Sequence, residues 1–448
     1  MDRSNVVLIV LDSLRKDRVS VYNDEIDFTP NIEEVAEESR VYSNANAQAP
    51  WTLPSVTSIF TGKYPWEHGA THGHGYYSGS EKLLGERFEE KGYRTKLATP
   101  NVWISSTAGN IDGFQSVENF LGLASREPLK TLMEKSNKAF SYLPIGLRGK
   151  IMDILTGFQH SFLDKFSTID SEKTVREGIR FLEDVEDENF FLFINVLSPH
   201  EPYDNGNPPK KYLEKHDVDT EKVPGTEKEY FQRDDVDLEE FRKAYDAAAD
   251  FTDDLVGRIH NAIKENDLED DTYFVIISDH GQALGQEGLF GHQFTLMDEV
   301  IETPLIISGP EIDSERVEEV FELRQLYNLL PSLAGISEER IQPLGEARGG
   351  YEFPDSYKNI VPDEKKDEID RKLRYVKDSK TKVVKSTGRS GDENYTATDL
   401  ESGENVEPEE ELRQRVNNTE AENCETLEPE EAERDEEVKK RLEKLGYM

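Results

Sequence analysis

The chain has 448 residues, of which 93 are acidic and 53 are basic, so its formal net charge at pH 7 is −40. This charge argues against a nucleic-acid-binding protein, which needs a basic surface to bind phosphates. The acidic residues are spread along the whole chain, which favours a protein of a halophilic archaeon, because a potassium-rich cytoplasm screens their mutual repulsion. Binding of a cationic partner is the weaker interpretation.

The sequence favours a cytoplasmic location. Its single cysteine, Cys424, excludes an intrachain disulfide and suits a reducing compartment. The first predicted strand begins directly after Met1–Ser4, without a basic and apolar leader, so we expect no signal peptide. No apolar run reaches the length of a membrane span. The sequence carries no signal for the oligomeric state.

Apolar runs of strand length alternate along the chain with amphipathic helical patterns. This alternation predicts an α/β fold with a mostly parallel sheet and helices on both of its faces. The predicted strands are 5–12, 93–97, 190–197, 273–278 and 304–307. The predicted helices are 29–39, 52–61, 81–91, 171–186 and 238–266.

Composition divides the chain into two parts. Residues 1–350 read as the catalytic domain, in which 120–170 is a possible insertion covering the site and 203–236 is a long polar loop. Residues 351–448 read as a small C-terminal subdomain with short antiparallel strands, followed by an acidic helical tail. The strand signals in this second part are 373–376 and 382–385.

A hydroxyl side chain, Thr52, stands at the start of a predicted helix between Pro50 and Pro54. The first amides of a helix lack intrahelical partners, and the helix dipole favours an anion there. A nucleophile at this position would face an anionic substrate. We therefore expect Thr52 to be a covalent nucleophile.

Two predicted strands end in residues that bind metals. Asp12 follows the first strand, and Asp279 and His280 follow strand 273–278. An Asp at such a position alone is more often a cap than a ligand. Ligands in open parallel sheets gather at the carboxyl ends of strands, so these residues can converge. Oxygen ligands with one imidazole suit a divalent cation such as calcium, magnesium or manganese, with zinc disfavoured.

Two further histidines are candidates for the substrate side of the site. His200 follows the apolar strand 190–197, and His292 follows a glycine-rich loop after Asp279. Either one could protonate a leaving group or contact the substrate oxyanion. Lys63 and Arg15 could neutralise an anion, although for each an ordinary surface charge is at least as plausible. The histidines of the segment 68–74 read as a loop with at most one member near the site.

Taken together, these motifs resemble the sulfatase family of the alkaline-phosphatase superfamily. The resemblance covers nearly the whole chain, and its elements occur in the family's order. Thr52-Leu53-Pro54-Ser55 with Thr61-Gly62 is similar to the family's C-x-P-S-R…T-G signature. The other matching segments are the strand ending in Asp12, Thr29-Pro30-Asn31 with Val41–Ala45, Gly92–Thr95, Pro199–Tyr203, Ser278–Gly281, Thr303–Ile306, and the small C-terminal sheet over 373–402. The resemblance implies an alkaline-phosphatase-like fold and a divalent metal held by Asp12, Thr52, Asp279 and His280.

The sequence also departs from the family pattern. Thr52 stands where true sulfatases have the cysteine that becomes formylglycine, and Val56 replaces the signature arginine. Ser13 replaces the second acid of the N-terminal pair, which favours a single metal. The usual lysine and histidine that grip sulfate are missing, and Asn101 is the nearest polar substitute for binding the substrate.

The threonine has a chemical consequence. A formylglycine hydrate expels sulfate by collapsing to an aldehyde, whereas a threonine ester must be cleaved by water or another acceptor. We therefore expect a metal-dependent hydrolase of a small-molecule or saccharide ester, with phosphate or phosphonate favoured over sulfate. A slow true sulfatase, a transferase of phosphorylated head groups onto glycan or lipid, and an inactive anion-binding homologue remain alternatives.

Overall fold

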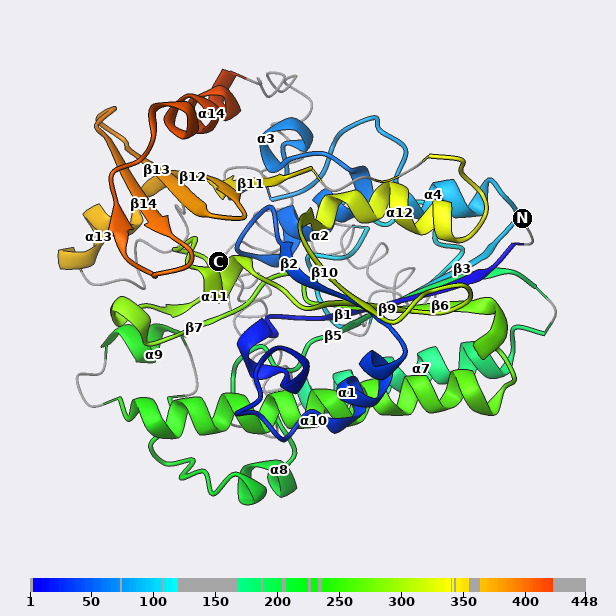
Figure 1. The fold of residues 1–448 in the computed structure, drawn as a ribbon. Coiled ribbons are helices and arrows are strands. Elements are labelled where there is room, and N and C mark those ends of the chain that lie inside the picture. The colour runs from blue at the N-terminus through cyan, green and yellow to red at the C-terminus, as the bar shows by residue number, and fades with distance from the viewer. Residues whose placement is uncertain are drawn as a thin grey trace, which may run out of the picture.

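The computed structural model describes residues 3–72, 75–106, 108–119, 167–186, 188–203, 207–224, 227–232, 236–339, 341, 344–353 and 363–421. Nearly all of the predicted insertion 120–170 lies outside these residues, as does the acidic tail after residue 421. Within them, a large central sheet is covered by helices on both faces, and a second, smaller sheet lies beside one end of it (Figure 1).

The central sheet has eight strands in the order β10-β2-β9-β6-β1-β5-β3-β4. All of its neighbouring strands pair in parallel except at β9, which is antiparallel to β6 and to β2. The predicted mostly parallel sheet is confirmed. In chain order the strands are β1 (Asn5–Leu11), β2 (Arg40–Asn46), β3 (Arg94–Thr99), β4 (Ser116–Asn119), β5 (Phe190–Val196), β6 (Thr272–Ile277), β9 (Leu305–Ser308) and β10 (Glu315–Glu322).

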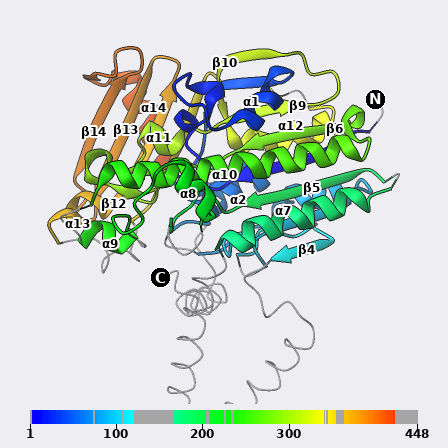
Figure 2. The ribbon, with the colours of Figure 1, turned by 90° about the horizontal axis from the view of Figure 1, so that it is seen from below.

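Apolar side chains on both faces of β1 explain why helices cover both faces of the sheet. Val7, Ile9 and Leu11 belong to the core under one helical layer, whereas Val6 and Leu8 belong to the core under the other. Strands buried on both faces read as continuous apolar runs, and each fully buried Val, Leu or Ile stabilises the fold by about 1.5–3 kcal/mol. The first layer contains α1 (Pro30–Glu37), α7 (Ser167–Glu183) and α10 (Leu238–Glu265), and the second contains α2 (Thr52–Thr61), α4 (Leu84–Glu89) and α12 (Leu326–Leu333). Figure 2 shows α10 running along the first face with α7 beside it.

The register of the central strands determines where in the fold the site lies. Leu11 pairs with Val196, and Val10 pairs with Ile277, so β1, β5 and β6 end at nearly the same level. The residues that follow these three strands therefore meet at one edge of the sheet. Asp12 continues the ladder there through its N–H, which donates to the carbonyl of Val196 at 2.9 Å.

The second sheet is antiparallel, as predicted, and begins with Glu346, slightly before the predicted boundary at residue 351. Tyr375 joins the two sheets, because its hydroxyl donates to the carbonyl of Ala47 at 2.7 Å. Its elements are β11 (Glu346–Tyr351), β12 (Arg371–Asp378), β13 (Thr381–Gly388), β14 (Glu393–Asp399), β15 (Asn405–Val406), α13 (Asp363–Ile369) and α14 (Glu410–Ala421).

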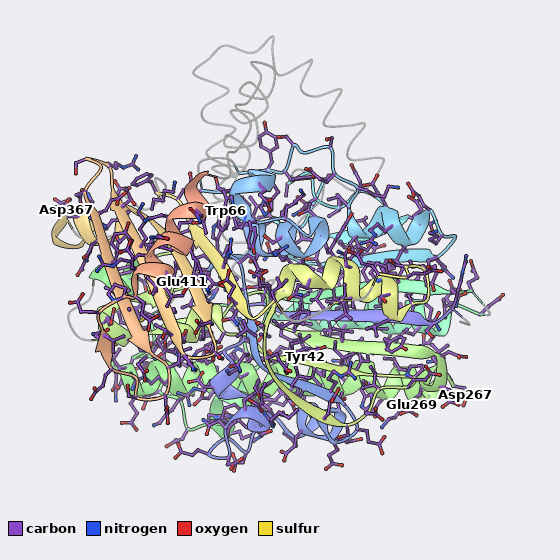
Figure 3. All side chains as sticks on the ribbon, turned by 45° about the horizontal axis from the view of Figure 1, so that its top comes forward. Tyr42, Trp66, Asp267, Glu269, Asp367 and Glu411 are labelled. Atoms are coloured by element: carbon purple, nitrogen blue, oxygen red, sulfur yellow. The ribbon has the colours of Figure 1, made fainter. Side chains whose placement is uncertain are left out.

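Acidic side chains lie at both ends of the molecule (Figure 3). Asp367 and Glu411 belong to the second sheet's helices, whereas Asp267 and Glu269 follow the far end of α10, and all four are exposed. Exposed acidic residues are therefore not confined to one end of the described residues.

The prediction of a long loop over 203–236 is wrong in part. This segment contains two helices, α8 (Lys210–Lys215) and α9 (Glu227–Gln232), each of which has only six residues. Six residues are too few to show a helical period in a sequence. The remaining short elements are α3 (Pro65–His68), α11 (Asp298–Ile301), β7 (Ala283–Leu284), β8 (Phe290–Gly291), and the 3-10 helices Lys16–Arg18, Ser20–Tyr22, Glu269–Asp271, Gln286–Gly288 and Leu323–Gln325.

Among the described helices, none combines the length and the apolar composition that crossing a bilayer requires.

Candidate active site

Three ligand-type side chains meet at the edge of the sheet where β1 and β6 end. Asp12, Asp279 and His280 are completely buried, and one ligand atom from each lies within 4.8 Å of the others. Because the two strands are neighbours in the sheet, residues 267 positions apart in the sequence come together here.

The hydrogen bonds of these residues leave atoms free for a cation. The Oδ1 atom of Asp279 accepts from the backbone N–H of Ser13 at 3.3 Å and of His280 at 3.1 Å. The Oδ2 atom of Asp279 is buried and has no hydrogen-bond partner among the described residues. The Nδ1 atom of His280 lies 2.9 Å from the carbonyl of Gly281, to which it donates, so its Nε2 lone pair faces Thr52 and the carboxylates. An orphaned carboxylate oxygen and an oriented imidazole are what a divalent cation requires.

Burial and mutual repulsion dominate the titration of this cluster. Burial, reinforced by Asp279, raises the pKa of Asp12 from 3.8 to about 6. Burial likewise raises the pKa of Asp279 to about 6, and lowers the pKa of His280 to about 4. At neutral pH the metal-free cluster is therefore two carboxylates and a neutral imidazole, which is the protonation state that metals bind.

The predicted nucleophile lies against this cluster. Thr52 is the first residue of α2, and its Oγ1 atom lies 3.5 Å from Asp12 Oδ2 and 3.4 Å from His280 Nε2. Ser55 fixes the start of the helix, because its hydroxyl donates to the carbonyl of Asp279 at 2.7 Å. The helix ends at Gly62 in the left-handed conformation, with φ of 73°. The prediction of a helix over 52–61 is confirmed.

Asn101, the predicted substitute for the missing cationic residues, also reaches the cluster. Its Nδ2 atom donates to Asp12 Oδ2 at 2.7 Å and lies 3.4 Å from Thr52 Oγ1. Its backbone N–H donates to the hydroxyl of Thr99, which in turn donates to Asn195 Oδ1 at 3.0 Å. Thr99 and Asn195, two buried polar residues of the sheet, thus fix the backbone of Asn101, whose side-chain amide lies at the nucleophile.

His200 and His292 lie next to the cluster. The His292 ring stacks on the His280 ring with centroids 4.4 Å apart, and the His200 ring meets the His292 ring edge-on at 5.1 Å. Burial opposes protonation of His200, but Glu201 and Asp12 outweigh it and raise its pKa to about 9 in the metal-free protein. Burial, with the neighbouring His280, lowers the pKa of His292 far below 6.5. The two imidazoles therefore differ in charge although they touch.

Other predicted residues do not join the site. Lys63 follows the opposite end of the ten-residue helix α2, roughly 15 Å along its axis from Thr52, so the geometry removes Lys63 from the substrate-binding residues. The guanidinium of Arg15 pairs with Asp17 and donates to the carbonyl of Gln282 at 3.1 Å, so it acts on the site through Gln282.

The remaining histidines divide between structural positions and the wall of the site. His68 lies under α2, with Nε2 at 3.0 Å from Ser58 Oγ, and His216 pairs with Asp250 at 2.9 Å. His260 stacks on Phe274. His74, His160 and Cys424 lie outside the described residues.

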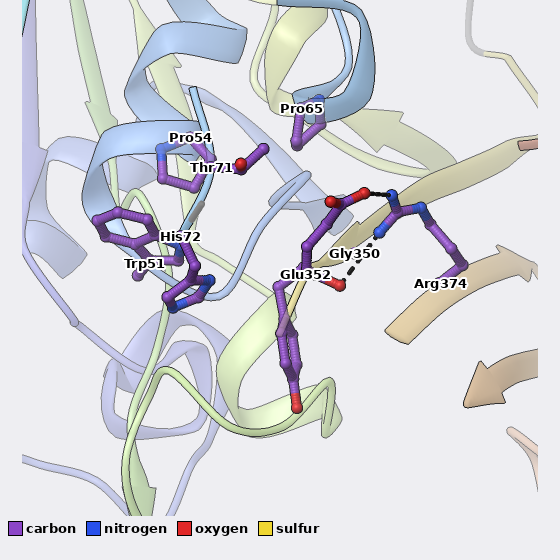
Figure 4. Close-up of a pocket in the computed structure, with 9 residues that line it drawn as sticks. Trp51, Pro54, Pro65, Thr71, His72, Gly350, Glu352 and Arg374 are labelled. Atoms are coloured by element: carbon purple, nitrogen blue, oxygen red, sulfur yellow. Dashed lines mark hydrogen bonds and ion pairs between the residues drawn. The ribbon is translucent and has the colours of Figure 1, made fainter. Parts of the chain in front are cut away.

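A pocket next to Thr52 separates the nucleophile helix from the second sheet (Figure 4). Trp51 packs on His72 with ring centroids 4.6 Å apart, and the His72 ring meets the Tyr351 ring edge-on at 5.8 Å. An ion pair between Arg374 and Glu352, 2.6 Å long, forms the far wall.

Sequence reasoning missed three residues that support the site. Glu201 and Gln282 are joined by a hydrogen bond of 2.5 Å, and Gln282 in turn contacts His292. Tyr245, on α10, donates to the carbonyl of Ser13 at 2.7 Å and accepts from the N–H of Arg15 at 2.8 Å. Glu201 and Gln282 each follow a predicted histidine closely, which could have identified them, whereas the distant Tyr245 gave no sequence signal.

Tyr245 holds the turn after Asp12, in which Ser13 has a left-handed φ of 63°. We expect Tyr245→Phe to weaken binding of Mn²⁺ by roughly 10–100-fold, the usual effect of losing a group that orients a metal ligand. Calorimetric titration of the chelator-stripped protein measures this affinity.

Tyr203→Phe is the matched control, because the Tyr203 hydroxyl is also buried but has no partner among the described residues, and its ring lies 6.0 Å from that of Tyr245. Its Mn²⁺ affinity should equal that of the unmodified protein. Equal affinities in both variants would show that the Tyr245 hydroxyl has no effect on the site.

Buried carboxylates, an imidazole and a helix-terminal hydroxyl thus converge at the carboxyl edge of a mostly parallel sheet. This combination of fold and site defines an ester-bond hydrolase of the alkaline-phosphatase structural class. A model of the sulfatase family matches residues 4–337, and the chain belongs to that family.

Known proteins give the extent of the similarity. The chain is 23% identical over 375 residues to YidJ, an uncharacterised sulfatase of Escherichia coli, covering 77% of this chain and 70% of YidJ. It is 24% identical over 408 residues to human iduronate 2-sulfatase, covering 76% and 70%. The solved phosphonate monoester hydrolase SpPMH of Silicibacter pomeroyi has the same fold, with a TM-score of 0.66, 16% identity and 94% of each chain covered. Alignments with five curated relatives span 60–70% of each relative's own length.

Proposed function

We propose that this sulfatase-family chain hydrolyses a phosphate or phosphonate ester through a covalent intermediate on Thr52. The observation that carries the proposal is the position of the Thr52 hydroxyl, 3.4–3.5 Å from His280 and Asp12, where the family's formylglycine precursor would stand. Two neighbours in structure are named phosphonate monoester hydrolases, and one curated relative is named a multifunctional alkaline phosphatase superfamily protein.

Asp12, Asp279, His280 and Thr52 fit a divalent cation, and calcium, magnesium or manganese suits their oxygen-rich set better than zinc. Such a cation supplies positive charge beside the Thr52 hydroxyl and the substrate oxyanion. Burial of all four residues keeps competing water away from this charge.

The chain's own residues then divide the reaction into two displacements. Thr52 Oγ1 gives up its proton to the Asp12 carboxylate, to which its hydroxyl donates, and attacks the phosphorus, while the bond to the leaving oxygen breaks on the opposite side. The amides at the start of α2 and the Asn101 amide donate to the charge that develops on the oxyanion. His200, which the nearby carboxylates keep protonated, lines the other side of the site and donates a proton to the departing alkoxide, and the neutral His292 ring packs against it. Water, or an acceptor alcohol, next displaces Thr52 and regenerates its hydroxyl.

A sulfate ester is the second candidate substrate, because the family and most similar proteins are named for sulfatase activity. Threonine lacks the second hydroxyl of a formylglycine hydrate, so a sulfated Thr52 would be released only by direct attack on sulfur. We therefore expect slow turnover of sulfates.

A panel of 4-nitrophenyl esters with one common leaving group tests the proposal. We expect kcat/KM for the phenylphosphonate or the phosphodiester to exceed that for the sulfate by at least about tenfold. Preference for the sulfate would contradict the proposed substrate class. Adding glycerol tests transfer to an alcohol, since a phosphorylated glycerol product would identify a transferase. Hydrolysis of no ester by the metal-loaded protein would favour an anion-binding homologue.

A further inference from the structure

A second group of metal-ligand side chains lies beside the proposed cation site. One ligand atom from each of His200, Glu201 and His292 lies within 4.8 Å of the others. Among the described residues, this group and the cluster of Asp12, Asp279 and His280 are the two groups whose side chains could hold a metal ion. The stacked His280 and His292 rings, 4.4 Å apart, make the two groups neighbours.

Hydrogen bonds orient both imidazoles of the second group in the same way. The Nδ1 atom of His200 lies 2.7 Å from the carbonyl of Glu201, and the Nδ1 atom of His292 lies 2.8 Å from the Oε1 atom of Gln282. Both acceptors take a proton from Nδ1, so Nε2 is the nitrogen that each ring can offer to a cation, and His200 must first release the Nε2 proton that it carries in the metal-free protein. Histidines that bind metals are held in this way, with one nitrogen on an oxygen acceptor.

Gln282 organises the group. Its Nε2 atom donates to Glu201 Oε2 at 2.5 Å while its Oε1 atom accepts from His292. Its own carbonyl accepts from the buried Arg15 guanidinium at 3.1 Å, and its N–H donates to the carbonyl of Glu299 at 3.2 Å. One anchored amide therefore fixes the carboxylate and an imidazole relative to each other.

In the metal-free protein the protonated His200 ring is the positive partner of the Glu201 carboxylate, a role that a bound cation would take over. The Glu201 side chain is only 11% exposed, and its ionic neighbour among the described residues is the His200 ring at 3.7 Å. A nearly buried carboxylate is costly unless a charge or a metal compensates it. The His200 side chain remains 26% exposed, so the group is accessible from solvent.

We propose that His200, Glu201 and His292 bind a second divalent cation, for which zinc is the best match. Two imidazoles and one carboxylate are a ligand set of zinc sites that keep a fourth position open, whereas the oxygen-rich first site suits a harder cation. The open position would hold an oxygen of the substrate, opposite Thr52. This inference deepens the proposed function and builds on the first cation, but its test does not depend on turnover.

The test is a count of zinc ions. The full-length, chelator-stripped protein is titrated with Zn²⁺ alone in a calorimeter, and the metal retained after gel filtration is measured by mass spectrometry. Because zinc also occupies oxygen-rich sites when nothing competes, we expect two equivalents per chain. His292→Ala and Glu201→Gln should each retain only the ion at the first site. Asp279→Asn should retain only the ion at the second site.

His260→Ala is the matched control, since His260 lies on α10 against Phe274 and belongs to neither group; it should retain two equivalents. Glu201→Gln changes no heavy-atom volume, so it decides the question should His292→Ala fail to fold. One equivalent in the unmodified protein, or two equivalents in Glu201→Gln, would overturn the second site. An inactive protein that binds two zinc ions would contradict the proposed function and leave this inference standing.

Discussion

Thr52→Ala should reduce turnover by roughly 10⁴-fold or more, the scale seen when a covalent nucleophile is removed. The variant keeps the α2 backbone, because the hydroxyl of Thr52 makes only long contacts, of 3.4–3.5 Å, with Asp12, His280 and Asn101. Circular dichroism and the thermal midpoint should therefore change little. Initial rates on the preferred 4-nitrophenyl ester measure the effect.

Thr61→Ala is the matched control for this variant. Thr61 is the same residue type at the other end of the same helix, and its hydroxyl donates to the carbonyl of Thr57 at 2.7 Å. Its loss should cost about 1 kcal/mol of stability without changing kcat. Near-normal activity in Thr52→Ala, or equal losses in both variants, would remove Thr52 from the mechanism.

Asp279→Asn should abolish cation binding at the first site and yet stabilise the metal-free protein. In the variant Oδ1 still accepts from the N–H groups of Ser13 and His280. The new amide nitrogen takes the position of the orphaned Oδ2, 3.4 Å from His280 Nε2, to which it can donate. Removing a buried charge whose pKa rises from 3.8 to about 6 should add up to about 3 kcal/mol to the free energy of unfolding.

The pH dependence of this gain has a definite sign. The Asp279 carboxyl loses its proton at a higher pH in the folded protein than in the unfolded chain, so its ionisation destabilises the fold as pH rises. The advantage of Asp279→Asn should be absent below about pH 4, should grow between pH 4 and 6, and should be complete above pH 6. Denaturant unfolding in the presence of chelator measures it.

Asp253→Asn separates this effect from burial alone. Burial also raises the pKa of Asp253 to about 6, but both of its carboxylate oxygens accept hydrogen bonds from Asn31 and Ile32. The amide nitrogen of the new asparagine would face one of these N–H donors and could not accept from it. The variant should therefore lose about 1–3 kcal/mol of free energy of unfolding. A loss of stability in Asp279→Asn, like that in Asp253→Asn, would show that Asp279 is an ordinary structural acid.

Much of the fold could be predicted because its central strands are buried on both faces. β1, β5 and β6 are uninterrupted apolar runs, and each was predicted within a residue or two of its bounds. β10 was not predicted, because it is an edge strand with the sequence Glu-Arg-Val-Glu-Glu-Val-Phe-Glu, whose first residues are exposed. The antiparallel direction of β9 depends on pairing with β6 and leaves no trace in its own four residues.

The site could be predicted where residues directly follow strands. Asp12, Asp279 and His280 meet because β1 and β6 are neighbours in register, which the rule about strand ends anticipates. Lys63 shows the limit of closeness in sequence, since a helix of ten residues separates it from Thr52. Glu201 and Gln282 follow predicted histidines closely, but the hydrogen bond between them forms across the edge of the sheet and is not encoded by that spacing.

The measurement that most directly tests the account is mass spectrometry of the metal-loaded protein quenched during turnover of an aryl phosphonate or phosphodiester. A mass gain equal to the transferred group, localised by fragmentation to the peptide's Thr52 and absent from Thr52→Ala, is the predicted result. Steady turnover with an unmodified Thr52 at every quench time, together with the adduct on another side chain, would contradict it.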